Sequence, residues 1–214
     1  MNTPLTETTA LPKRARGRPR KTLDERDEGN RRRQLMKAAA RLFRRKGFDA
    51  TSTRDIASAV GMHSGSPFYH FKSKSELLYA VMEDGMQSAL ERQASAVHAD
   101  DSPEQQLMRL IRSHFDTLHG PGRDFIPVML YENRSLTTKQ RAGIARMQRS
   151  YEAAWMPSLQ ALHDSGRLRA DARLARLLIF GALNWSVQWY DARKQASLDE
   201  ITDAAMALFI RDTT

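Results

Sequence analysis

Compact hydrogen-bonding side chains and several aromatic rings gather in a short segment, residues 52–71, with the sequence STRDIASAVGMHSGSPFYHF. Ser64, Ser66, Tyr69 and His70 fall in its second half, at spacings that place them outward on one short helix. Side chains of these types can meet base edges and phosphates in the major groove of DNA. The segment therefore predicts a nucleic-acid contact, and a plain pair of packed helices is the alternative that its periodicity leaves open.

A helix-turn-helix arrangement is expected to position these side chains. Ile56 and Val60 follow helical spacing up to Gly61, where a tight turn is predicted. A second short helix then directs Phe68 and Phe71 toward the interior. This order of helix, turn and helix is typical of proteins that read the major groove.

Positive charge is concentrated in the N-terminal part of the chain. Residues 1–75 contain 18 Lys and Arg against 7 Asp and Glu, whereas residues 76–214 contain 16 against 18. Such a surface attracts a polyanion, because neutralised phosphates release their condensed counterions. The distribution favours a nucleic-acid partner, and a solvated basic tail is the alternative.

Enzyme chemistry finds little support in the sequence, which predicts no catalytic, cofactor-binding or metal-binding residue. There is no cysteine, which excludes disulfides and thiolate metal sites and fits a reducing compartment. His114 and His119 are five residues apart, and the sequence has no His-Glu-x-x-His, glycine-rich phosphate loop or serine elbow. Without a secretory signal or a long apolar run, the protein is expected to be soluble and cytoplasmic.

The fold class is predicted to be all-α, with about nine helices. Capping boxes, in which a Ser or Thr and an acid or amide three residues later satisfy free amides, mark five helix starts. They are Ser52-x-x-Asp55, Ser73-x-x-Glu76, Ser102-x-x-Gln105, Thr137-x-x-Gln140 and Ser197-x-x-Glu200. Asp171 is expected to cap one more helix.

The stretch from Asn30 to Met82 resembles the DNA-binding domain of TetR-family transcriptional regulators. The matching elements are Phe-x-x-Lys-Gly-Phe, Asp-Ile-Ala, Val-Gly and Phe-Tyr-His-Phe-Lys-Ser-Lys-x-Glu-Leu, in the family's order. The resemblance implies a homodimer in which each subunit has a three-helix reading domain and a larger domain that binds a small-molecule effector. Such a protein would be a sequence-specific regulator, a repressor that leaves a palindromic operator when the effector binds.

The same resemblance carries DNA-contacting roles over to particular residues. Thr53 and Arg54, at the start of the second helix, and Lys74, at the start of the next, match phosphate contacts. The recognition helix is matched by Ser64, Ser66, Phe68, Tyr69 and His70. His63 and Pro67 depart from the family's pattern, so the resemblance implies no base preference.

The basic run KRARGRPRK, residues 13–21, is similar to the core of an AT-hook in its Gly17-Arg18-Pro19 centre flanked by Arg16 and Arg20. That similarity implies an extended arm whose arginines enter the minor groove at A·T pairs. Pro19 also biases Arg18 away from helical conformation. A disordered tail that adds only charge is the alternative for the arm, and an architectural protein of AT-rich DNA is the alternative function.

Two antiparallel helices are predicted at the C-terminal end, over residues 171–193 and 198–211, with another long helix over residues 138–165. Their apolar stripes comprise Leu174, Leu178, Ala182 and Trp185 on the first and Ile201, Ala205 and Leu208 on the second. These stripes are expected to form a four-helix bundle with a second copy. Packing within one chain is the alternative.

Polar groups among the aromatics of the C-terminal half indicate a ligand pocket, although helical spacing also suits a plain core. The predicted lining is Phe115, Tyr131, Trp155, Asn184 and Trp185. The stretch GALNWSVQWY is similar to TetR-type regulators of fatty-acid and acyl-CoA metabolism, so an acyl-CoA or other apolar molecule is the expected effector.

The predicted organisation is a basic, disordered arm over residues 1–29, a DNA-binding domain over 30–75 and an effector-binding and dimerisation domain over 76–214. An all-α enzyme is a further alternative.

Overall fold

The computed structural model describes residues 23–62, 67–121, 123–191, 193 and 196–211. These residues form ten α-helices and one 3-10 helix, and they contain no strand, so the predicted all-α class is confirmed. Complete capping boxes begin four helices, at Ser52, Ser102, Thr137 and Ser197. Ser73 and Asp171 also cap their helices through their side chains. Local sequence therefore sets most of the helix starts.

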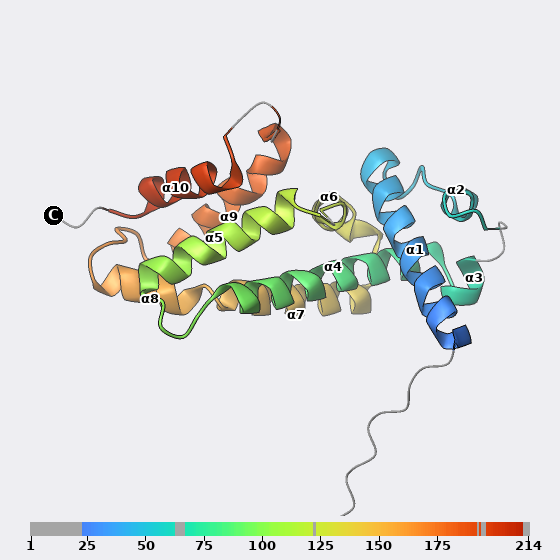
Figure 1. The fold of residues 1–214 in the computed structure, drawn as a ribbon, viewed down its shortest axis with the longest axis horizontal. Helices are drawn as coiled ribbons and strands as arrows, with labels where there is room; N and C mark the ends of the chain where they lie inside the picture. Colours follow the sequence, from blue (N-terminus) through green and yellow to red (C-terminus); the bar gives the residue numbers. More distant parts are fainter. Residues whose placement is uncertain (1–22, 63–66, 122, 192, 194–195, 212–214) are drawn as a thin grey trace, which may run out of the picture.

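Three helices form a small group at one end of the molecule: α1 (Leu23–Lys46), α2 (Thr53–Ser58) and α3 (Pro67–His70) (Figure 1). Gly47 and Gly61 follow α1 and α2 with φ of 81° and 68°, a left-handed conformation that glycine adopts without steric cost. Ile56, on α2, and Phe71, just after α3, are buried as the helix-turn-helix pattern requires. The side chain of Phe68 lies outside the described residues.

A long helix, α4 (Lys74–Ala96), leads from this group into the larger C-terminal part. That part contains α5 (Pro103–His119), α6 (Phe125–Tyr131), the 3-10 helix η1 (Asn133–Ser135), α7 (Thr138–Ala153), α8 (Met156–Asp164), α9 (Ala172–Trp189) and α10 (Leu198–Phe209). Figure 1 shows α4 and α7 side by side; α5 packs on α4, and α9 and α10 pack against α5. One apolar core, from Leu35 in α1 to Ile210 after α10, joins the two groups.

The single helix predicted over residues 138–165 is wrong, because the chain turns at Ala154 and Trp155 between α7 and α8. Pro157 explains the break: proline has no N–H to donate, and its ring conflicts with the carbonyl four residues earlier. α9 also ends before the predicted boundary at residue 193, at Trp189. No helix within the described ranges is long and apolar enough to cross a membrane.

Candidate DNA-binding surface and ligand cavity

The N-terminus of α2 is held in place by its capping box. Ser52 donates its backbone N–H and its hydroxyl to Asp55 Oδ2, each at 2.9 Å, and its hydroxyl accepts the N–H of Asp55. These hydrogen bonds lower the pKa of Asp55, because they stabilise its carboxylate. Thr53 and Arg54 begin α2, with Arg54 exposed, so both stand at a fixed helix N-terminus of the kind that suits phosphate.

The recognition helix presents Tyr69 outward. Its side chain is 77% exposed and makes an edge-on ring contact with the half-buried His70, with ring centroids 5.2 Å apart. The other predicted contacts in this part of the chain cannot be placed beside them, because they lie outside the described residues: Ser64, Ser66, the side chain of Phe68, and Arg16, Arg18 and Arg20 of the arm.

Lys74 makes contacts within the domain that its family role does not anticipate. Its ammonium donates to the carbonyl oxygens of Phe48 at 2.8 Å and Thr51 at 2.9 Å, and lies 4.2 Å from the centre of the Phe48 ring. These bonds close the turn between α1 and α2 against the start of α4. A DNA phosphate that bound Lys74 would therefore share its ammonium with the carbonyl groups that it already binds within the protein.

Two polar contacts tie the end of α1 and the turn after it to the two residues that flank α6. Arg44 pairs with Asp124, with Nη1 and Oδ1 2.7 Å apart, and the Phe48 N–H donates to Glu132 Oε1 at 3.0 Å. The partners in each pair are more than 75 residues apart in the chain, so no local pattern could have indicated them. Helix α6 thus contacts the reading domain directly.

A small cavity lies between α4, α5, α6, α7 and α9. Its lining is Met86, Ala89, His114, Thr117, Ile126, Met129, Leu130, Gln148, Tyr151, Glu152, Phe180 and Asn184. His114 Nε2 is 3.2 Å from Asn184 Oδ1, an acceptor, so Nε2 carries the proton and Nδ1 accepts from the Tyr151 hydroxyl at 3.0 Å. Burial lowers the pKa of His114 to about 4 and raises that of Tyr151. The cavity therefore offers a neutral, oriented polar group in a wall that combines apolar side chains with other polar ones such as Gln148 and Glu152.

The five residues predicted to line the effector pocket do not meet in one cavity. Asn184 lines the cavity, whereas the fully buried Trp155 donates its indole N–H to Gln93 Oε1 at 2.9 Å. Phe115 is also buried, beside His119. Tyr131 and Trp185 lie on the surface instead. Trp185 follows Asn184 by one residue, which turns its side chain by about 100° around α9 and away from the cavity.

His114 was not predicted to line the pocket, although it forms the polar centre of the cavity together with Tyr151. A histidine among apolar residues usually belongs to the core, and nothing local distinguishes His114 from that case. The tyrosine that meets it comes from another helix, 37 residues further along the chain. Only the packing of α5, α7 and α9 brings the three hydrogen-bonding groups together.

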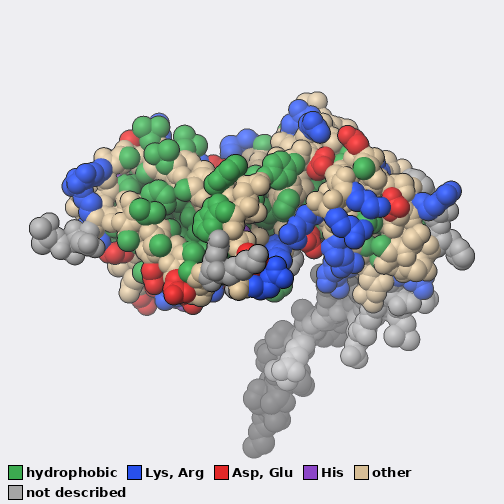
Figure 2. Space-filling model, turned by 90° about the horizontal axis from the view of Figure 1, so that it is seen from above, with side chains coloured by type: hydrophobic (Ala, Val, Ile, Leu, Met, Phe, Trp, Pro, Cys, Tyr) green, Lys and Arg blue, Asp and Glu red, His purple; other side chains and the backbone are tan. Residues whose placement is uncertain are grey.

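An apolar surface covers the outward side of α9 and part of α10. Its members are Leu174, Leu177, Leu178, Trp185 and Trp189 on α9 and Leu208 on α10. Trp185 is 65% exposed and Leu208 is 82% exposed. Figure 2 shows hydrophobic side chains gathered over the larger group of helices on this face, and Lys and Arg side chains toward the α1 end. Of the predicted stripe, Ala205 is buried, because α10 packs against α5.

Comparison with known proteins agrees with this geometry. Residues 35–81 match a model described as bacterial regulatory proteins, tetR family. Residues 100–213, about half of the chain, match the tetracyclin repressor-like C-terminal domain. The chain belongs to the TetR family. It is a DNA-binding transcriptional regulator with the helix-turn-helix that this family name implies, and its curated relatives are regulators rather than enzymes.

Individual relatives cover most of the chain. The transcriptional repressor KstR2 of Mycolicibacterium smegmatis is 26% identical over 190 residues, 86% of this chain and 91% of that protein. The structure of the superantigen PfiT is 34% identical with a TM-score of 0.72, over 85% of this chain and 97% of that one. The fold alone is shared with AibR bound to isovaleryl coenzyme A and operator DNA, at 24% identity and a TM-score of 0.77 over 84% and 97% of the two chains.

Proposed function

We propose that this regulator is a repressor that binds a palindromic operator as a homodimer and leaves it when a small acyl compound binds. The observation that carries the proposal is the exposed Tyr69 on α3, a helix that packs against α2 with its capped N-terminus. Together they present an aromatic edge for bases and a helix terminus for phosphate on one small group of helices. The α9 surface supplies an apolar area for a second copy, as a palindrome requires.

The domain division that we propose follows the sequence analysis for a DNA-binding domain up to residue 75 and an effector-binding and dimerisation domain over 76–214. The first boundary is corrected: the arm predicted over residues 1–29 ends before Leu23, where α1 begins. Helix α4 crosses the second boundary without a break, and α6 contacts α1. A change around the cavity can therefore reach the reading domain by two routes. Coupling of this kind is typically worth about 1–3 kcal/mol.

The proposed DNA contacts comprise Thr53, Arg54, Ser64, Ser66, Phe68, Tyr69, His70 and Lys74. Tyr69→Ala tests the central one, on an operator recovered by binding-site selection from genomic fragments. We expect affinity to fall by about 1–3 kcal/mol in gel-shift titrations, with relaxed choice at one base position. Met108→Ala, which removes an exposed apolar side chain from α5, is the matched control. Equal affinity of both variants and the wild type would remove Tyr69 from the interface.

We also propose that Arg16, Arg18 and Arg20 enter the minor groove beside the operator. Deleting residues 1–22, which leaves α1 intact, should cost more affinity on an operator with A·T flanks than on one with G·C flanks, at one salt concentration. Arg18→Ala should reproduce much of that difference. An equal loss of affinity on both operators would mean that the arm contributes only positive charge, since charge alone does not distinguish A·T flanks from G·C flanks.

The proposed effector is an acyl-CoA or another largely apolar molecule. The cavity supports this class through its apolar lining and the neutral His114 at its wall. KstR2 is named a repressor, and AibR was crystallised with isovaleryl coenzyme A, which makes acyl-CoA the first compounds to test. Effector and operator should weaken each other's binding by the same factor, because linkage is reciprocal. Asn184→Leu should reduce that response while operator affinity without effector stays unchanged.

A footprint separates this proposal from an architectural role. A discrete protected palindrome supports an operator-binding repressor. Uniform protection of any AT-rich DNA would support the architectural protein that the basic N-terminal sequence also permits.

A further inference from the structure

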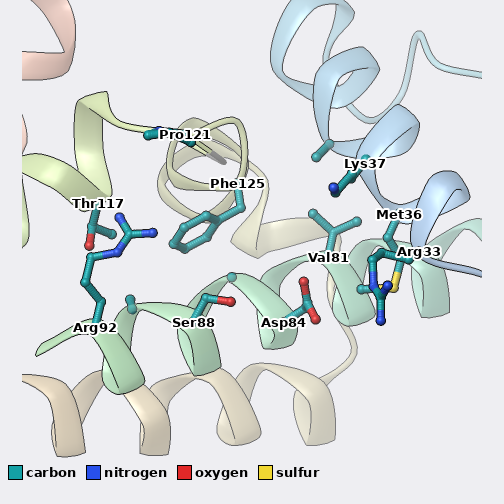
Figure 3. A pocket seen from close by; sticks show the side chains of 13 residues that line it. Arg33, Met36, Lys37, Val81, Asp84, Ser88, Arg92, Thr117, Pro121 and Phe125 are labelled. Atoms are coloured by element: carbon teal, nitrogen blue, oxygen red, sulfur yellow. The ribbon is translucent and has the colours of Figure 1, made fainter. Parts of the chain in front are cut away.

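A second cleft, of about 220 Å³, lies between α1 and α4 beneath Phe125 of α6. Figure 3 shows Arg33 and Lys37 at the end of the cleft near α1, and Arg92 at the other end, pointing toward Thr117 and Phe125. The cleft is lined by Arg33, Met36, Lys37, Ala40, Val81, Asp84, Gly85, Ser88, Ala89, Arg92, Thr117, Pro121 and Phe125.

The three cations of this cleft are not neutralised by the part of the chain that the structure describes. None of Arg33, Lys37 and Arg92 takes part in an ion pair there. Asp84 lines the same cleft but is the one carboxylate among its described lining residues. Three cations from two helices that face one cleft favour a ligand with more than one negative charge.

The cleft and the His114 cavity share two wall residues, Ala89 of α4 and Thr117 of α5. The two spaces therefore lie next to each other. Arg92 lines the cleft one turn of α4 beyond Ala89, and Figure 3 shows its guanidinium directed toward Thr117 and Phe125. A ligand that filled the cavity and continued past Ala89 would enter the cleft at Arg92.

The cleft is long, and its lining mixes apolar and polar side chains. Its floor follows α4 from Val81 to Arg92, which at 1.5 Å per residue spans roughly 16 Å. Apolar groups such as Met36 and Phe125 alternate along it with Asp84 and Ser88, which can hydrogen-bond to amides. Such a channel suits a thin, amide-containing chain that ends in a charged group.

We propose that the cleft binds the phosphorylated arm of a CoA thioester. In this arrangement the acyl group occupies the His114 cavity, the thioester lies near Arg92, and the pantetheine arm follows α4. Arg33 and Lys37 then hold the phosphates of the nucleotide head group. The inference rests on the proposed effector binding and deepens it, because it says which part of the molecule each space takes.

Such a ligand would bridge the two groups of helices. Arg33 and Lys37 belong to α1 of the reading domain, whereas Arg92 belongs to the far half of α4. The phosphates would favour one placement of α1 along α4, and DNA would favour the placement that fits its half-sites. Ligand and operator would then compete through the position of α1.

Calorimetric titration of the full chain without DNA tests the assignment. The probes are butyryl-, octanoyl- and palmitoyl-CoA, the S-acyl pantetheine of the chain that binds most tightly, and the corresponding free fatty acid. The variant is Arg33→Gln with Lys37→Gln, two exposed positions whose change should not disturb the core. The matched control is Lys139→Gln with Arg149→Gln, which removes two exposed cations from α7, outside the cleft.

We expect the wild type to bind the CoA thioester at least about tenfold more tightly than the S-acyl pantetheine, which lacks the nucleotide phosphates, or the free acid. The double variant should lose that difference and keep its affinity for the pantetheine, while the control should match the wild type. The inference is overturned if no CoA thioester binds, if pantetheine or fatty acid binds equally well, or if the variant matches the control. Gel shifts without ligand, run in parallel, would show separately whether operator binding itself fails.

Discussion

The ring of Phe125 lies directly on Gly85, so that α6 and α4 touch where α4 has no side chain. A Cβ built on Gly85 would overlap three carbons of that ring. Both residues also line the cleft between α1 and α4. The contact fixes the height of α6 over α4, and with it the roof of the cleft and one wall of the His114 cavity.

Gly85→Ala should therefore displace Phe125 and destabilise the protein, although alanine favours helix more than glycine. Overpacking of this kind costs about 1–3 kcal/mol. The control is Gly29→Ala in α1, where nothing lies within 4 Å and the same change should be neutral or stabilising by up to about 1 kcal/mol. Urea unfolding of both variants measures the difference. Equal stability would mean that α6 can shift on α4 without cost.

Lys74→Met should lower the free energy of unfolding, because the carbonyls of Phe48 and Thr51 lose a charged donor. Hydrogen bonds to charged groups contribute about 1.5–3 kcal/mol, and partial exposure of Lys74 places the effect near the lower figure. Salt dependence of operator binding then tells whether Lys74 also contacts phosphate. If Lys74 contacts a phosphate, the variant should reduce the slope of log operator affinity against log salt concentration by about 0.9 per subunit. A purely structural role would leave that slope unchanged.

Leu178→Asp together with Trp185→Asp should dissociate the proposed dimer, since both side chains lie on the exposed apolar side of α9. Sedimentation velocity should give the mass of one chain for this variant and of two for the wild type. Met108→Asp, an exposed apolar position on α5, is the control and should stay dimeric. A variant that remains dimeric would place the interface elsewhere.

His114 should make the protein less stable in mild acid. Burial lowers its pKa from 6.5 to about 4, so the unfolded chain binds a proton more tightly than the native site. The contribution of the neutral His114 to the free energy of unfolding is fully present above pH 6.5 and is lost as the pH falls toward 4. At pH 5 the loss is about 2 kcal/mol.

His119, whose pKa is also lowered to about 4 by burial, acts in the same direction, so the measurement is a comparison. Urea unfolding should show that the free energy of unfolding falls less between pH 7.5 and pH 5 for His114→Gln than for the wild type. An unchanged difference would mean that the native site protonates as readily as the unfolded chain.

The sequence could determine the helices and the reading domain because both depend on neighbours in the chain. A Ser or Thr three residues before an acid or amide satisfies the same free amides in any fold, and the predicted caps at Ser52, Ser102, Thr137 and Ser197 are present. Gly61 likewise adopts the left-handed turn that its position between two apolar runs indicates. A local signal also marks the break between α7 and α8, because Pro157 lies in the first turn of α8.

Only the tertiary structure decided which residues share a site. The pocket predicted from aromatic residues failed at Trp185, because one step along a helix turns a side chain from the cavity to the surface. His114, Tyr151 and Asn184 meet across three helices, and Ala89 and Thr117, from two helices, line both the cavity and the cationic cleft. These contacts depend on how helices stack, which is set by packing over the whole core and not by spacing within one segment.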